Sequence, residues 1–169
     1  MRRLEVAYDT AGRPFRYSSY DAATGGTVVN QVEQAYNGLG QLVTEYQAHA
    51  GVVNPSTTPK VQYASSEMAG GANHSRPVSL TYPNGRVLTA TYATGLDSTI
   101  SRLSSLTEGS TTLEAFSYLG LDTVVQRAHP QPGVDLTYIK ATGEANGAAG
   151  DPYTGLDRFG QVVDISAGG

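Results

Sequence analysis

Histidine is the side chain best suited to exchange a proton or bind a metal at neutral pH, and this chain has three: His49, His74 and His129. A zinc site needs three or four converging ligands, and no close histidine spacing such as H-x3-H occurs. The chain also has no cysteine, which excludes a cysteine-based metal site and a disulfide framework. We therefore expect the three histidines to lie in solvated loops, with no metal and no cofactor.

The fifteen acidic residues could act as general acids or bases, but no pattern singles out a catalytic pair. A pair of carboxylates for glycoside cleavage stays open, because spacing along the sequence does not fix spacing in the fold. Segments 9–12 and 21–25 lack the alternating acids of a calcium loop, and their aspartates are typical of turns. Neither G-x-S-x-G nor H-E-x-x-H occurs, and Gly38-Leu39-Gly40 lacks the third glycine of a dinucleotide loop. The sequence does not predict an enzyme.

Charge and composition indicate which classes of partner the chain is not expected to bind. The net charge is −4 and the pI is about 5.2, so we expect binding neither to nucleic acid nor to an anionic membrane surface. The sequence holds no apolar run of 18 residues, so we expect no membrane insertion. Met1-Arg2-Arg3 leads into a charged stretch, so we expect no secretion signal there, and the compartment stays undetermined. Tyrosine outnumbers phenylalanine eleven to three, which suits a sheet whose rings pack while their hydroxyls stay hydrated.

A short turn motif recurs along the chain and indicates how the remaining residues are positioned. Its first copy is Tyr8-Asp9-Thr10-Ala11-Gly12-Arg13, in which an aromatic strand end meets a turn closed by glycine. Aspartate or asparagine can bond its own backbone two residues on, and glycine reaches the positive φ that such a turn requires. A degenerate copy lies at 118–122. The clearer copies comprise Tyr8, Asp9, Gly12, Arg13, Tyr36, Asn37, Gly40, Gln41, Tyr82, Asn84, Gly85, Arg86, Asp157, Phe159, Gly160 and Gln161.

Alternating apolar and polar residues between these turns predict short strands, and no stretch has the periodicity of a helix. The best hairpin signal is Asn84-Gly85 between two alternating runs. The motif copies begin near residues 8, 36, 82, 118 and 156, and this uneven spacing favours a growing antiparallel meander over a solenoid or propeller. We expect an all-β, open meander of hairpins with loops at 47–59, 65–75 and 140–151. The expected strands are 4–8, 13–20, 28–36, 42–46, 60–63, 78–82, 87–92, 100–107, 111–118, 123–128, 134–139 and 162–165.

The motif resembles the YD repeat of the RHS (rearrangement hotspot) proteins, which include bacterial polymorphic toxins and the teneurin ectodomains. The resemblance implies a strongly curved β-sheet that spirals into a hollow shell, and in bacterial members the shell encloses a toxin. It also suggests a secreted or cell-surface location. The family's D-P-x-G-L self-cleavage motif does not fit here, because Asp151-Pro152-Tyr153-Thr154-Gly155-Leu156 has one residue too many. We assign no protease role to Asp151, and we expect residues 1–169 to form a single repeat region, a fragment of a longer shell.

Two hypotheses for function follow. In the first, the chain is a structural wall segment with no chemistry of its own, its partners being neighbouring repeats and an enclosed toxin domain. This hypothesis predicts free edge strands at both ends of the sheet. In the second, the chain is a cell-surface module that binds carbohydrate or mediates adhesion through exposed tyrosines. Cross-strand packing is the alternative role of these rings, which are Tyr8, Tyr36, Tyr46, Tyr63, Tyr82, Tyr92 and Tyr118.

Overall fold

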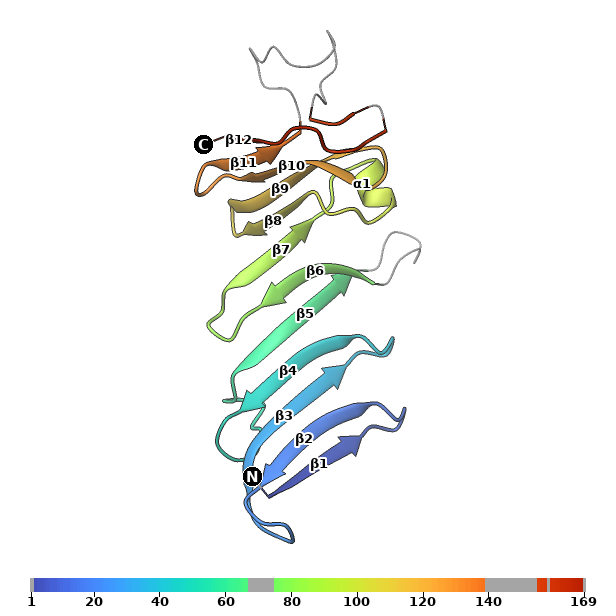
Figure 1. Ribbon diagram of the computed structural model, residues 1–169. Coiled ribbons are helices and arrows are strands. Elements are labelled where there is room, and N and C mark those ends of the chain that lie inside the picture. Colours follow the sequence, from blue (N-terminus) through green and yellow to red (C-terminus); the bar gives the residue numbers. More distant parts are fainter. Residues whose placement is uncertain (1, 67–74, 139–154, 158, 169) are drawn as a thin grey trace. The chain divides into compact units, whose positions relative to one another are not determined.

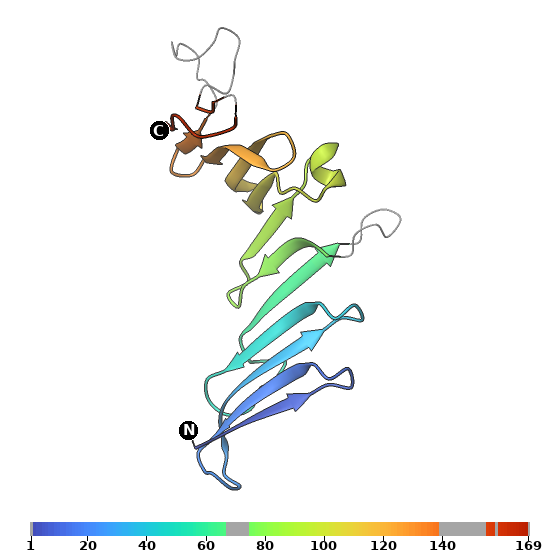
Figure 2. The same ribbon diagram turned by 45° about the vertical axis from the view of Figure 1, so that its right-hand side comes forward.

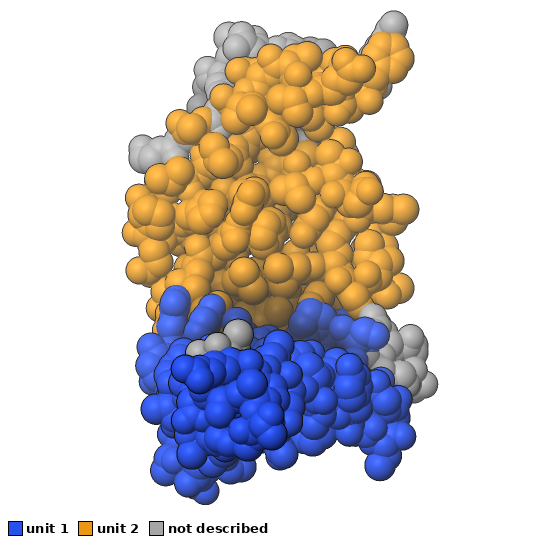
Figure 3. Space-filling view, turned by 60° about the horizontal axis from the view of Figure 1, so that its bottom comes forward, with its two compact units in different colours: residues 1–87 blue, residues 88–169 orange. Residues whose placement is uncertain are grey.

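The computed structural model describes residues 2–66, 75–138, 155–157 and 159–168. These residues form two compact units, 1–87 and 88–169, which Figure 3 shows in different colours. Within each unit every strand pairs antiparallel with a strand next to it in the sequence, so the expected all-β antiparallel meander is confirmed. The expected loops at 65–75 and 140–151 lie wholly or mostly outside the described residues.

The first unit is built from six strands in sequence order (Figure 1). The sheet is open, and Figures 1 and 2 show its strands as one gently twisted layer. Strong curvature, which the family resemblance implied, is therefore not found within this unit. Its strands are β1 (Arg3–Tyr8), β2 (Pro14–Tyr20), β3 (Val28–Tyr36), β4 (Leu42–Ala48), β5 (Lys60–Ser66) and β6 (Arg76–Thr81).

The second unit continues with short strands and one turn of helix. Antiparallel pairing joins β7 to β8, β8 to β9, β9 to β10, β10 to β11 and β11 to β12. The elements are β7 (Val87–Thr91, whose first residue ends the first unit), α1 (Leu96–Thr99), β8 (Ser105–Glu108), β9 (Thr111–Leu119), β10 (Thr123–His129), β11 (Val134–Thr137) and β12 (Ser166–Gly168).

The connection between β7 and β8 corrects two sequence predictions. No helix was expected and a strand was expected from 100, but α1 occupies 96–99 and β8 begins only at Ser105. The Asp97 carboxylate accepts hydrogen bonds from Arg102 Nε (2.6 Å) and Ser104 Oγ (2.8 Å), and the Asp97 carbonyl accepts one from the Arg102 amide. These local polar bonds hold the chain in a compact loop in place of an extended ladder.

The last strand also lies later than expected. Residues 162–165 were predicted to form it, but Val162 makes only an isolated bridge to Leu156, and the amide of Val163 donates to the carbonyl of Gly155. This segment therefore folds back on the hairpin around Asp157, and the pairing with β11 begins at Ser166.

Alternation along the strands gives the sheet of the first unit two different faces. Cross-strand partners share a face, so the register Val6–Tyr17–Val32 defines an apolar face. The other face, the polar face, includes Glu5, Ser18, Gln31 and Ala48 in one cross-strand row. On this polar face Ser18, Gln31 and Ala48 are buried, because the loop after β4 packs there and the Val53 amide donates to Gln31 Oε1 (2.9 Å).

Candidate functional site

The hairpin corner at Asp9–Arg13 has the hydrogen bonds that the motif predicts. The Asp9 amide donates to the Arg13 carbonyl (2.9 Å), and the Gly12 amide donates to the Asp9 carbonyl (3.0 Å). Gly12 has a φ of 79°, so the corner is a type I turn followed by a bulge with glycine in the left-handed region. Asp9 Oδ1 accepts from the amides of Ala11 and Arg13, which fixes the corner from its first residue.

The same frame occurs twice more. Asn37 replaces Asp9 in the corner that ends at Gln41, and its Oδ1 accepts from the amides of Leu39 and Gln41 (both 3.0 Å). In the last corner Asp157 Oδ1 accepts from the amides of Phe159 and Gln161 (both 2.8 Å). In each corner the glycine amide donates to the carbonyl of the first residue. Three of the predicted copies are therefore one and the same turn.

The Tyr82 copy has the same backbone turn, but its tyrosine lies one position later in the turn than Tyr8 does in the first copy. The Tyr82 amide donates to the Arg86 carbonyl (2.8 Å) and the Gly85 amide to the Tyr82 carbonyl (2.9 Å). Tyr82 therefore occupies the position of Asp9, not that of Tyr8, and Asn84 Oδ1 supplies the side-chain bond to the Arg86 amide. The degenerate copy after Tyr118 is a different turn, a three-residue connection at 120–122.

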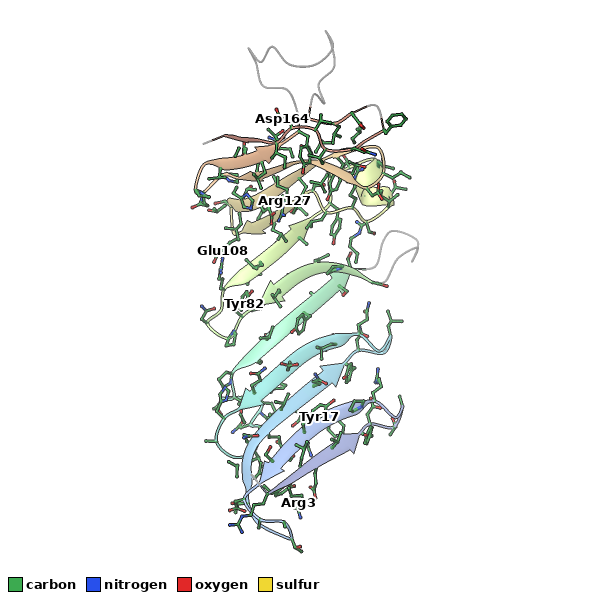
Figure 4. All side chains as sticks on the ribbon, in the orientation of Figure 1. Arg3, Tyr17, Tyr82, Glu108, Arg127 and Asp164 are labelled. Atoms are coloured by element: carbon green, nitrogen blue, oxygen red, sulfur yellow. The ribbon has the colours of Figure 1, made fainter. Side chains whose placement is uncertain are left out.

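In the first unit successive connections lie at opposite ends of the strands, as in any antiparallel meander. The Asp9 corner joins β1 to β2 and the Asn37 corner joins β3 to β4, so both lie at the same end of the strands (Figure 1). The Tyr82 corner follows β6 at the opposite end, where Figure 4 labels its tyrosine. The motif residues therefore do not converge on one site.

What links the two neighbouring corners is a three-residue contact. Arg13 Nε donates to Asp9 Oδ2 (2.7 Å), and the Arg13 guanidinium carbon lies 4.6 Å from the centre of the Tyr36 ring. The hydroxyl of Tyr36 donates to the carbonyl of Pro14 (3.0 Å), the residue directly after Arg13. We call this arrangement an Asp–Arg–Tyr clasp. It joins the start of β2 to the end of β3.

The second unit contains a second clasp, formed by Asp97, Arg102 and Tyr118. Arg102 bonds Asp97, and its guanidinium carbon lies 4.2 Å from the centre of the Tyr118 ring. The Tyr118 hydroxyl donates to the carbonyl of Leu103 (2.7 Å), again the residue directly after the arginine. Arg102 Nη1 also donates to the carbonyls of Gly120 and Leu121. The same three contacts thus connect the lead-in of β8 to the end of β9.

Sequence reasoning found only part of these clasps. It selected Asp9, Arg13 and Tyr36 as turn residues and Tyr118 as a degenerate copy, but it missed Asp97 and Arg102. A sequence pattern could have found them. An aspartate and an arginine precede one strand, and the next strand along the chain ends in a tyrosine. Because the contact joins residues distant in sequence, turn chemistry alone does not reveal it.

The electrostatics of the clasps favour the ionised carboxylates. Backbone bonding by the Arg13 amide, together with the Arg13 guanidinium, lowers the pKa of Asp9 below its ordinary value. Bonds from the Ser104 hydroxyl and from Arg102 lower the pKa of Asp97 in the same way. Burial raises the pKa of Tyr118. Both carboxylates are therefore ionised at neutral pH, and each accepts a charge-assisted hydrogen bond from the arginine of its clasp.

The histidines do not assemble a metal site in the described part of the chain, where no group of three His, Asp or Glu side chains could hold an ion. His49 is exposed in a loop, as expected, and His74 lies outside the described residues. The expectation for His129 was wrong: it ends β10, because the strand runs on to pair with Val134. Its Nε2 lies 3.5 Å from Glu114 Oε1, which also accepts from Arg127 Nε (2.8 Å).

The tyrosines proposed as a sugar platform are dispersed where the structure describes them. Tyr46 is opposite Lys60 on the polar face, whereas Tyr63 lies on the apolar face of the same sheet. Arginines stack on the rings of Tyr36, Tyr82 and Tyr118, in three different connections. No helix among the described residues is long and apolar enough to span a membrane.

Comparison with known protein families finds no matching family, and comparison with curated proteins finds no match.

Proposed function

We propose that this chain is a structural segment of an RHS-type β-sheet wall, which helps to enclose a toxin or other cargo within a larger shell. The segment acts by mechanical exclusion: backbone ladders hold the wall together and keep the enclosed polypeptide from solvent and proteases. Its partners are neighbouring repeats that extend the sheet and the enclosed cargo. No chemical step is assigned to any residue.

The observation that carries this proposal is the recurrence of the clasp in both units. A wall made by adding hairpins needs a device that fixes each new hairpin against the preceding one. The Arg13–Tyr36 and Arg102–Tyr118 pairs supply it at equivalent places, the lead-in of one strand and the end of the next. The ordinary ladder bonds of the sheet hold neighbouring strands but do not by themselves specify the register.

The sparse core also supports a role within a larger assembly. Among the described residues only Ala48, Val125 and Leu156 are buried apolar side chains. Soluble domains are normally built from at least two packed layers around a common core. A sheet of this kind gains stability from material that covers its faces and extends its edges, which neighbouring repeats and cargo provide.

The test uses the natural polypeptide that contains this chain, digested with a protease under native conditions. We expect a cargo segment that resists digestion in the parent and becomes susceptible when both clasps are opened by Arg13→Ala and Arg102→Ala. Arg127→Ala is the matched control, because its ion pair to Glu114 lies outside the clasps and its side chain is half exposed. Equal cleavage of cargo in all three proteins would contradict the proposal, as would glycan binding by the parent in an array screen.

A further inference from the structure

The apolar face of the first unit carries exposed side chains in the part of the unit that the structure describes. Its side chains include Leu4 and Val6 on β1, Tyr17 on β2, Val32 on β3, and the paired Tyr63 and Leu80 on β5 and β6. Leu4 is 57% exposed, and Val6 and Tyr63 are each 37% exposed. Within the described part of the first unit, Figure 4 shows these strands as a single layer with their side chains on its two faces.

Charge separates the two faces sharply. The polar face carries Arg3, Glu5, Arg16, Glu33 and Lys60 along its cross-strand rows. On the apolar face the strands β1–β6 place one charged side chain, Glu45, and its two carboxylate oxygens accept from Gln34 Nε2 (3.0 Å) and Gln47 Nε2 (2.7 Å).

The loop after β4 packs on the polar face, where the Gly51 amide donates to the carbonyl of Val29 and the Val53 amide to Gln31. Among the described residues of the first unit, the covering loop thus lies on the polar face and not on the apolar face. Exposed apolar side chains gathered on one face of a sheet are typical of an interaction site.

Size and symmetry indicate what covers it. Six strands about 4.8 Å apart and about 23 Å long present a face of roughly 650 Å². Two copies in contact would cover roughly 1,300 Å², within the usual range for a specific interface. The face is mostly apolar and carries one charged group, the amide-bridged Glu45, with the uncharged polar residues Ser19, Asn30, Gln34 and Gln47 between its apolar side chains. Two copies present the same face to each other, and such an isologous contact closes after two copies.

We propose that the apolar face of residues 1–87 packs against the same face of a second copy, forming a two-layered sandwich. Aligned packing of two twisted sheets is the ordinary way in which such faces are buried. The contact uses the apolar face of the sheet, so it leaves the edge strands free to pair with neighbouring repeats and the polar face free for cargo.

The test measures the oligomeric state of the purified chain by sedimentation velocity over about a hundredfold range of concentration. We expect a dimer for the parent, and for Tyr63→Lys a dimer dissociation constant raised at least about tenfold, because a lysine would be buried at the contact. Gln62→Lys is the matched control: it is the neighbouring exposed residue on the polar face, and we expect it to leave the dimer intact. Far-UV circular dichroism verifies that each variant stays folded.

A second measurement does not depend on a destabilising variant. The chain has no cysteine, so single substitutions give specific cross-linking sites. With a short bis-maleimide, Val32→Cys should link two copies and Gln62→Cys should not. A monomeric parent at all concentrations would overturn the proposal. So would equal weakening by Gln62→Lys, or a ladder of larger cross-linked species that indicates growth at the strand edges.

Discussion

Removing Arg102 should test the clasp most directly, because its side chain makes more contacts than that of Arg13, the arginine of the other clasp. Its side chain is only 13% exposed, and it stacks on Tyr118 at 4.2 Å. A partly desolvated stacking of this kind is worth about 1–2 kcal/mol. The bonds to the carbonyls of Gly120 and Leu121 add about 1 kcal/mol together, since these exposed carbonyls recover water. We expect Arg102→Ala to lower the free energy of unfolding of the second unit by about 2–3 kcal/mol.

A double-mutant cycle separates the stacking contact from everything else that the substitution changes. The free energies of unfolding of the parent, Arg102→Ala, Tyr118→Leu and the double variant are measured by urea denaturation. The expected coupling energy is about 1–2 kcal/mol, the value of the stacking contact. Tyr118→Phe is the control: it keeps the ring and loses only the hydroxyl bond to Leu103, so it should cost about 1 kcal/mol. Its coupling to Arg102 should be small.

A coupling energy between Arg102 and Tyr118 below about 0.3 kcal/mol, the usual scatter for independent sites, would show that the two side chains do not stabilise each other. Hydrogen exchange provides a second check. Opening the clasp should increase amide exchange in β8 and β9 more than in β10 and β11, because the clasp joins the first two strands. Uniform acceleration throughout the unit would indicate a general loss of stability.

Two further predictions follow from the corners and their carboxylates. Gly12→Ala should destabilise the first unit by about 1 kcal/mol because Gly12 has a φ of 79°, whereas Gly38→Ala, at an uncrowded position without positive φ, should have little effect in the same denaturation assay. The pKa of Asp97 is lowered in the fold, so its contribution is present above the ordinary value of 3.8 and is lost as the pH falls through the lower folded value. The melting temperature of the parent should therefore drop on acidification below about pH 4 and that of Asp97→Asn should drop less; parallel curves would count against the assignment.

The strands and corners could be predicted from the sequence because both depend on local chemistry. Alternation defines a strand, and Asp9 with Gly12 defines a turn, whatever the rest of the chain does. The Tyr82 corner shows the limit of such matching. Its glycine and arginine were aligned correctly, but the backbone bonds place Tyr82 itself at the first turn position.

The parts that were not predicted depend on contacts between distant residues or on competition between local bonds. Asp97 bonds Arg102 and Ser104, and this local network replaces the strand that alternation predicted from residue 100. The final strand begins at Ser166 because residues 162–165 pair back to the Asp157 hairpin. His129 was expected in a loop, yet β10 continues to it, the last residue before Pro130.

The clasps explain why the motif copies can be unevenly spaced in one continuous meander. A clasp requires only that an arginine precede one strand and that a tyrosine end the next strand. In an antiparallel pair these two strand ends lie side by side. The connection at the other end of the strands is free to vary: between β2 and β3 it is a seven-residue bend held by Asp21 and Thr27, whereas between β8 and β9 it is a tight turn of two residues. Register is thus fixed at one end of the strands while length varies at the other, and a repeat read from turn residues alone will look irregular even where the structural unit recurs.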